Sequence, residues 1–115
     1  MSRSWEQKTA IVVAAYYRVH PDDRQKFIDA VLPEMQAAQQ IPGCIYYAFA
    51  QDLADPNTFH LSEGWRDEEA FEAHEKSETF LTALRTVVST VRILERQGMD
   101  YIVAEQRLDD PRHQL

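Results

Sequence analysis

The sequence predicts an α+β fold of the ferredoxin-like type, with elements in the order strand, helix, strand, strand, helix, strand. Residues 10–19 are apolar at both alternating sets of positions, and residues 44–65 form two alternating stretches around a turn. The segments 22–38 and 67–90 instead repeat apolar residues at intervals of three and four. This order predicts a four-stranded antiparallel sheet with the helices on one face.

Length and composition fit one domain. The 115 residues are enough for one core and too few for two, so we expect a single domain over 1–115, with its core at about 10–108 and a polar tail at 109–115. The net charge of −7 would repel phosphate backbones and anionic lipid, so we expect neither nucleic acid nor membrane as a partner. With one cysteine, Cys44, and no apolar run of membrane-spanning length, we expect a soluble, cytoplasmic protein.

The first strand and the first helix follow from residues 10–38. The strand is apolar on both faces, which indicates that both faces are covered. The sequence His20-Pro21-Asp22-Asp23 ends the strand and opens a helix that reaches Ala38. Pro33 removes the hydrogen bond to the carbonyl of Asp29, so we predict a kink or a break there.

A β-hairpin is predicted between Pro42 and Trp65. Pro42-Gly43 interrupts the helix, and residues 55–57, Asp-Pro-Asn, supply turn chemistry between two alternating stretches. Symmetric pairing about Asp55 would set Tyr47 opposite Glu63 and Ile45 opposite Trp65.

The second helical region is predicted in two pieces. The first runs from Asp67 to about Lys76, and Ser77 caps a second that ends near Thr90. Its apolar stripe is Phe80, Leu84, Val87, Val91 and Leu94. The state of residues 89–98 stays open between helix and strand, because Gly98 could be a helix stop or a hairpin turn. We expect the last strand over Met99–Ala104.

The helices cover one face of this sheet, yet the first, second and last strands carry apolar residues on both. The bare face therefore needs a partner, and we predict a homodimer that packs sheet against sheet.

Three segments carry a resemblance to a known family: Pro42-Gly43-Cys44-Ile45-Tyr46-Tyr47, Phe59-x-Leu61-x-Glu63-x-Trp65 and Asp67-Glu68-Glu69-Ala70-Phe71-x-Ala73-His74. In these segments the chain resembles the antibiotic biosynthesis monooxygenase family, and the resemblance runs from about Ile11 to Tyr101. It implies a dimeric α/β barrel of ferredoxin-like subunits.

The same resemblance implies several activities, because the family includes cofactor-free quinol and polyketide monooxygenases, haem-degrading members and a member that processes a signal molecule. The haem-degrading members resemble one another in an asparagine on the first strand and a histidine late in the second helical region. Here the first strand reads Ala14-Ala15-Tyr16-Tyr17, and no histidine lies between His74 and His113. This departure argues against haem degradation.

The resemblance places the face that carries Glu63 and Trp65 under the helices. A pocket there would be lined by Tyr47, Phe49, Leu61, Glu63 and Trp65, with His74 pointing into the same space from the following helix.

Such a pocket suits oxygen insertion into an electron-rich phenol or quinol without a cofactor. The substrate must first lose a proton, and His74, with an ordinary histidine pKa of about 6.5, is the first candidate for the base. Trp65, Phe49 and Leu61 would hold a flat ring, and Tyr47 would hydrogen-bond the phenolate or a peroxy intermediate. Glu63 would orient His74 or act as the base itself.

Each residue also has a structural interpretation. Trp65 could be a core residue, and His74 could be hydrogen-bonded at the edge of its helix. Glu63 could be paired with Tyr47, Arg85 or Arg92, since an unpaired buried carboxylate costs several kcal/mol.

No metal-ligand spacing and no glycine-rich phosphate loop is present, so we expect neither a metal nor a nucleotide cofactor. The leading prediction is a cofactor-independent monooxygenase acting on an aromatic, quinol or polyketide-like small molecule. The alternatives are a non-catalytic dimeric binding or stress-related module and an isomerase acting on a small oxygenated signal molecule.

Overall fold

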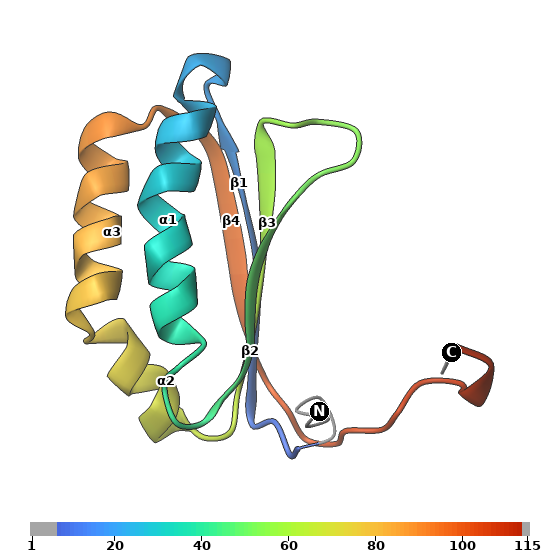
Figure 1. Cartoon of the computed structure of the whole chain (residues 1–115). Helices are drawn as coiled ribbons and strands as arrows, with labels where there is room; N and C mark the ends of the chain where they lie inside the picture. The colour runs from blue at the N-terminus through green and yellow to red at the C-terminus, as the bar shows by residue number, and fades with distance from the viewer. Residues whose placement is uncertain (1–6, 114–115) are drawn as a thin grey trace.

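Figure 1 shows the computed structural model of the chain, which describes residues 7–113. Its first half contains β1 (Ile11–Val19), a short 3-10 turn (Pro21–Asp23), α1 (Arg24–Ala38), β2 (Cys44–Gln51) and β3 (Thr58–Trp65). Its second half contains α2 (Glu68–Glu75), α3 (Glu78–Thr90), β4 (Ile93–Ile102) and a second 3-10 turn (Pro111–His113). Residues 1–6 of the predicted domain and residues 114–115 of the predicted tail lie outside the described residues.

The four strands form one antiparallel sheet in the order β2-β3-β1-β4, and the helices lie on one of its faces (Figure 1). The predicted ferredoxin-like α+β fold is therefore confirmed. The core fills the space between the two layers. One apolar cluster surrounds Trp65 and Tyr47, and another surrounds Phe27 and Phe59.

α1 continues without interruption through Pro33, so the predicted break is wrong. The proline removes one hydrogen bond, at a cost of about 3 kcal/mol in a helix interior. Phe27, Val31 and Ala38 are buried on the same helix and offset that cost, because burying one large apolar side chain contributes about 1.5–3 kcal/mol. Pro33 itself faces solvent.

The hairpin pairs Tyr47 with Glu63 as predicted, but Ile45 does not lie opposite Trp65. Cys44 pairs with Trp65, and the register shifts between Cys44 and Tyr46. Ile45 is therefore an extra residue, as in a β-bulge, which a symmetric pairing scheme does not contain.

A side-chain cap starts each of α2 and α3, and the predicted cap at Ser77 is confirmed. The Asp67 carboxylate accepts a hydrogen bond from the backbone N–H of Ala70 at 2.8 Å. The Ser77 hydroxyl accepts one from the backbone N–H of Phe80 at 3.2 Å. Each cap satisfies a backbone donor that the first turn of a helix leaves without a partner.

The last strand begins at Ile93 and ends at Ile102, so the predicted bounds Met99–Ala104 are wrong. Gly98 lies inside this strand opposite Ala15 and is neither a helix stop nor a turn. Asp23 fixes the change from helix to strand, because its carboxylate accepts hydrogen bonds from the backbone N–H of Arg92 at 2.8 Å and from its guanidinium at 2.9 Å.

The predicted apolar stripe of the second helical region is correct only in part. Val87 and Val91 are buried, but Leu84 is 48% exposed and Leu94 lies in β4 instead of the helix. Ala83, which the stripe did not include, is buried.

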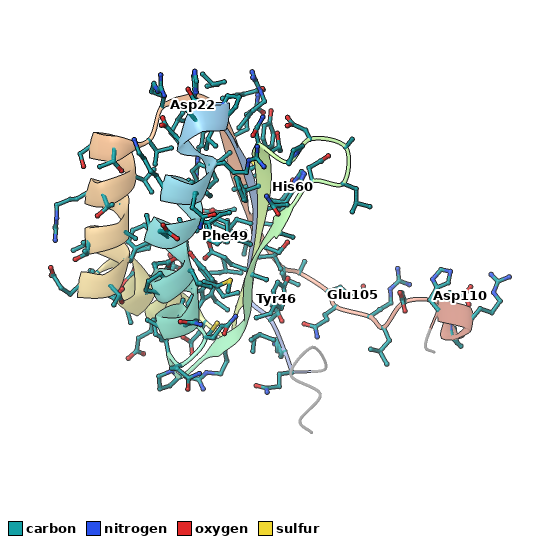
Figure 2. All side chains as sticks on the ribbon, turned by 45° about the horizontal axis from the view of Figure 1, so that its top comes forward. Asp22, Tyr46, Phe49, His60, Glu105 and Asp110 are labelled. Carbon is teal, nitrogen blue, oxygen red and sulfur yellow. The ribbon has the colours of Figure 1, made fainter. Side chains whose placement is uncertain are left out.

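The two faces of the sheet differ in their side chains. Figure 2 shows Phe49 between the sheet and the helices, and Tyr46 and His60 on the opposite side. That open face also carries Ala14 and Ala48, both exposed. After β4 the chain runs away from the body, with Glu105 and Asp110 on this arm (Figure 2).

Candidate active site between the sheet and the helices

β3 directs Glu63 and Trp65 toward the helices, because residues two apart on a strand share a face. Trp65 is fully buried, and its indole Nε1–H donates a hydrogen bond to Glu63 Oε1 at 2.9 Å. This bond differs from the predicted structural pairings of Glu63. Arg85 pairs with Glu78 and Arg92 pairs with Asp23 instead.

His74 of α2 is 2% exposed and lies against three aromatic rings. Its ring stacks on Trp65 with centroids 5.1 Å apart and an interplanar angle of 23°. It meets Tyr47 edge to face at 5.1 Å and Phe80 at 4.7 Å. Burial lowers the pKa of His74 to about 4, so its imidazole is neutral at pH 7.

The other predicted residues lie around this group. Tyr47 and Leu61 are buried, and Phe49 is half-buried with its ring 6.1 Å from that of Tyr47. The structure thus brings together all six predicted side chains, which come from β2, β3 and α2.

Glu34 of α1 is a residue of the site that the sequence reasoning missed. A side-chain hydrogen bond joins it to Tyr47, and its Oε1 lies 3.8 Å from His74 Nε2. The carboxyl group is 4% exposed, yet among residues 7–113 Oε1 has no hydrogen-bond partner. A signal was present in the sequence, because Glu34 lies on the same helical stripe as Val31 and Ala38 and is the charged position among apolar ones.

Two buried carboxyl groups therefore face one aromatic cluster. Burial raises the pKa of Glu34 to about 7, and the hydrogen bond with Tyr47 opposes this effect. Burial also raises the pKa of Glu63 to about 7, and the charge of Glu34 adds to the rise while the Trp65 hydrogen bond opposes it. The pKa of Tyr47 is raised far above its ordinary value by burial and by these two carboxyl groups. Both carboxyl groups can thus exchange protons near neutral pH.

Two hollows that share lining residues lie beside this group. The hollow that we call the β4 cavity has a volume of about 350 Å³ and is lined by Val13, Glu63, Phe71, His74, Glu75, Arg96, Gly98, Met99 and Asp100. The one that we call the core cavity has a volume of about 100 Å³ and is lined by Tyr17, Phe27, Val31, Glu34, Tyr47, Phe49, Leu61, Glu63, Phe80, Ala83, Leu84, Val87 and Arg96.

Glu63 and Arg96 line both cavities and therefore mark their boundary. The Arg96 guanidinium lies 5.3 Å from the centroid of the Tyr17 ring. It also occupies the space above Gly98, where an added Cβ would lie 3.0 Å from its nitrogens. The sequence reasoning missed Arg96 because it began the last strand at Met99.

The described residues 7–113 contain no group of three or more histidine, cysteine, aspartate and glutamate side chains placed to hold a metal ion. In the same part of the chain, no helix combines the length and the apolar character needed to cross a membrane.

Two curated proteins are similar to the chain over more than half of its length. The chain is 36% identical over 64 residues to "Uncharacterized protein sll1783" from Synechocystis, a match that spans 56% of this chain and 44% of that protein. It is 30% identical over 70 residues to "Putative monooxygenase YcnE" from Bacillus subtilis, which spans 61% of this chain and 74% of that protein.

A solved structure agrees in fold. It is described as "Putative antibiotic biosynthesis monooxygenase from Nitrosomonas europaea", and it superimposes with a TM-score of 0.75 and 25% identity over 83% of this chain and 99% of that chain. Residues 10–86 match the family described as antibiotic biosynthesis monooxygenase. The chain therefore belongs to the antibiotic biosynthesis monooxygenase family.

Proposed function

We propose that the protein is a cofactor-independent monooxygenase that oxidises a phenol, quinol or polyketide-like aromatic small molecule with dioxygen. The observation that carries the proposal is the position of Glu63. Its carboxyl group has a pKa of about 7, lines the β4 cavity and is held by the indole of Trp65. The cavity volume of about 350 Å³ falls within the range of small-molecule pockets, about 300–1,000 Å³.

In the proposed reaction, Glu63 takes the proton of the substrate hydroxyl. A base works best when its pKa lies near the working pH, which favours Glu63 over His74, whose pKa is about 4. The neutral His74 ring lines the β4 cavity and holds the substrate ring in place, while Trp65 stacks on the His74 ring and supports it. Tyr47, Phe49 and Leu61 line the adjoining core cavity. Arg96 brings a positive charge to the boundary of the two cavities, where the phenolate would form.

The open face of the sheet supports a homodimer as the working form. Ala14 and Ala48 are exposed there, as are the β4 residues Met99 and Tyr101, at 58% and 53%. A second copy packed on this face would remove these apolar side chains from water and leave the two cavities, which lie on the helix side, open to substrate.

Oxygen uptake tests the proposal. Purified protein is given a panel of quinols and polycyclic phenols, without added metal or flavin, and wild type is compared with Glu63→Gln. The expected result is uptake that falls ~100-fold in Glu63→Gln, because general-base catalysis contributes about that much. Glu69→Gln, an exposed acid on α2, is the matched control and should retain the wild-type rate.

Uptake that is equal in wild type and Glu63→Gln would remove Glu63 as the base. His74→Ala then tests the histidine in the same assay. No uptake by the wild type with any compound of the panel would overturn the monooxygenase proposal.

An isomerase is the second candidate, and the two proton-exchanging carboxyl groups favour it. Two such groups on one substrate can move a proton between carbon atoms without dioxygen. Conversion of an α-hydroxy ketone under anaerobic conditions, followed by exchange of its carbon-bound hydrogen with deuterated water, separates this activity from oxygen-dependent turnover.

A further inference from the structure

The core cavity is smaller than the β4 cavity. It is also lined by Glu34, which has a buried oxygen atom without a hydrogen-bond partner among residues 7–113. The core cavity volume of about 100 Å³ is less than a third of the about 350 Å³ of the β4 cavity, and it is sufficient for a two-atom oxygen group. A substituent on a ring held in the β4 cavity would reach the core cavity at the boundary formed by Glu63 and Arg96.

Glu34 is the buried group in the core cavity whose hydrogen bonds are incomplete. Oε1 has no partner among residues 7–113, although leaving a buried polar atom unpaired costs about 1–3 kcal/mol. The nearest ring nitrogen, His74 Nε2, lies at 3.8 Å, beyond hydrogen-bond distance. A group that hydrogen-bonds Oε1 from the cavity would remove this cost.

We propose, building on the proposed monooxygenase function, that the core cavity receives the peroxide group formed on the substrate and that Glu34 transfers the protons that convert it to a carbonyl group and water. Glu34 is then a second catalytic residue, distinct from the base Glu63.

The steps balance for a phenol with hydrogen on the carbon that is oxygenated. Glu63 takes the phenolic proton, and the phenolate gives two electrons to dioxygen as a carbon–oxygen bond forms, leaving a ring-bound peroxide anion. Protonated Glu34 gives its proton to the terminal oxygen. The Glu34 carboxylate then removes the proton from the oxygenated carbon, whose electron pair forms the carbonyl while the oxygen–oxygen bond breaks. The departing hydroxide takes the proton held by Glu63, so that one phenol and one dioxygen yield one quinone and one water.

The surroundings of Glu34 suit this double role. Tyr47 from β2, Glu63 from β3 and His74 from α2 face its carboxyl group, and Arg96 from β4 lines the same cavity. Arg96 would stabilise the peroxide anion before its protonation. Burial raises the pKa of Glu34 to about 7, so the group can both give and take a proton near neutral pH.

The products of Glu34→Gln test the inference. A phenol that supports wild-type uptake is supplied, and quinone, organic hydroperoxide and dioxygen are measured together, with triphenylphosphine used to titrate the hydroperoxide. Loss of the carboxylate should block removal of the carbon-bound proton. Quinone formed per dioxygen should therefore fall at least 10-fold and substrate hydroperoxide should accumulate. Glu63→Gln should slow uptake without raising the hydroperoxide fraction, and Glu72→Gln, exposed on α2, should match wild type.

Glu34→Asp provides a second variant, since it keeps a carboxyl group but withdraws it from the cavity by one methylene, and it should give an intermediate hydroperoxide fraction. Unchanged quinone per dioxygen in a folded Glu34→Gln protein would overturn the inference and leave the monooxygenase proposal intact. Absence of uptake by the wild type would overturn both.

Discussion

Glu63 illustrates how one buried residue links stability to chemistry. Its pKa rises from 4.5 to about 7 because the folded protein removes the carboxyl group from water. The folded state therefore holds this proton more tightly than the unfolded chain does. The stability that Glu63 contributes is complete below pH 4.5 and is lost as the pH rises through 7.

Comparison of wild type with Glu63→Gln should show this loss directly. Between pH 4.5 and 8, the free energy of unfolding of wild type should decrease relative to that of Glu63→Gln. The expected decrease is up to about 3 kcal/mol, the free energy that corresponds to the pKa shift of Glu63. Urea denaturation at the two pH values measures it. His74, whose pKa is lowered to about 4, contributes in the opposite sense, with stability lost as the pH falls below 6.5, but it is present in both proteins and cancels.

Glu69→Gln serves as the matched control for loss of one acid from an exposed site. If the unfolding free energies of wild type and Glu63→Gln change equally with pH, the folded state does not hold a proton on Glu63 more tightly than the unfolded chain does.

Among the elements, the turn between α1 and β2 is constrained both in its backbone conformation and in the space around it. Gly43 has a φ of 92°, which side chains other than glycine rarely adopt, and an added Cβ would lie 2.6 Å from the Cβ of Ala70 in α2. The close approach holds the start of α2, and hence His74, against the sheet.

Gly43→Ala should therefore destabilise the protein by about 1–3 kcal/mol, the cost of a strained backbone position. Thermal and urea unfolding measure the change. In the control Gly98→Ala the backbone has no positive φ, and the new Cβ would lie 3.0 Å from the Arg96 guanidinium, which can move, and 3.1 Å from the Ala15 Cβ, so its loss should be smaller. Equal losses in the two variants would contradict a special constraint at Gly43.

The elements also show what local sequence can predict. Caps at Asp67 and Ser77 and the alternation of β3 are local, so α2, α3 and the presence of the hairpin were predicted correctly, whereas the pairing of Ile45 with Trp65 was not. The start of β4 was not, because its anchor, Asp23, binds Arg92 from 69 positions away. The same is true of the site. The six predicted residues lie on elements that local sequence predicts, whereas the contact between Glu34 and Tyr47 depends on how α1 packs on the sheet.

At the scale of the whole molecule, the proposed homodimer can be tested at its centre. Ala14 is exposed in the middle of the open face, on a strand with neighbours on both sides. A charge placed there would lose its water on association, at a cost of several kcal/mol. Wild type should sediment at micromolar concentration with about twice the 13.4 kDa chain mass, and Ala14→Arg as the monomer.

Val88→Arg is the matched control, since Val88 is 74% exposed on α3, on the other side of the sheet. It should remain dimeric. A wild-type protein that sediments as a monomer would contradict sheet-to-sheet packing.

The strand order has a consequence for synthesis on the ribosome. β1 emerges first but pairs along its length with β4, in which Ile102 is the partner of Ile11. At ~5–20 residues per second, several seconds pass before that partner emerges, and during this time one edge of β1 has unpaired backbone groups. Gly98 and Arg96 of the β4 cavity arrive with the same strand. A nascent chain that ends before β4 should thus bind chaperones at β1. It should also lack a complete ligand pocket. Protection from aggregation and ligand binding therefore both begin only when β4 has been made.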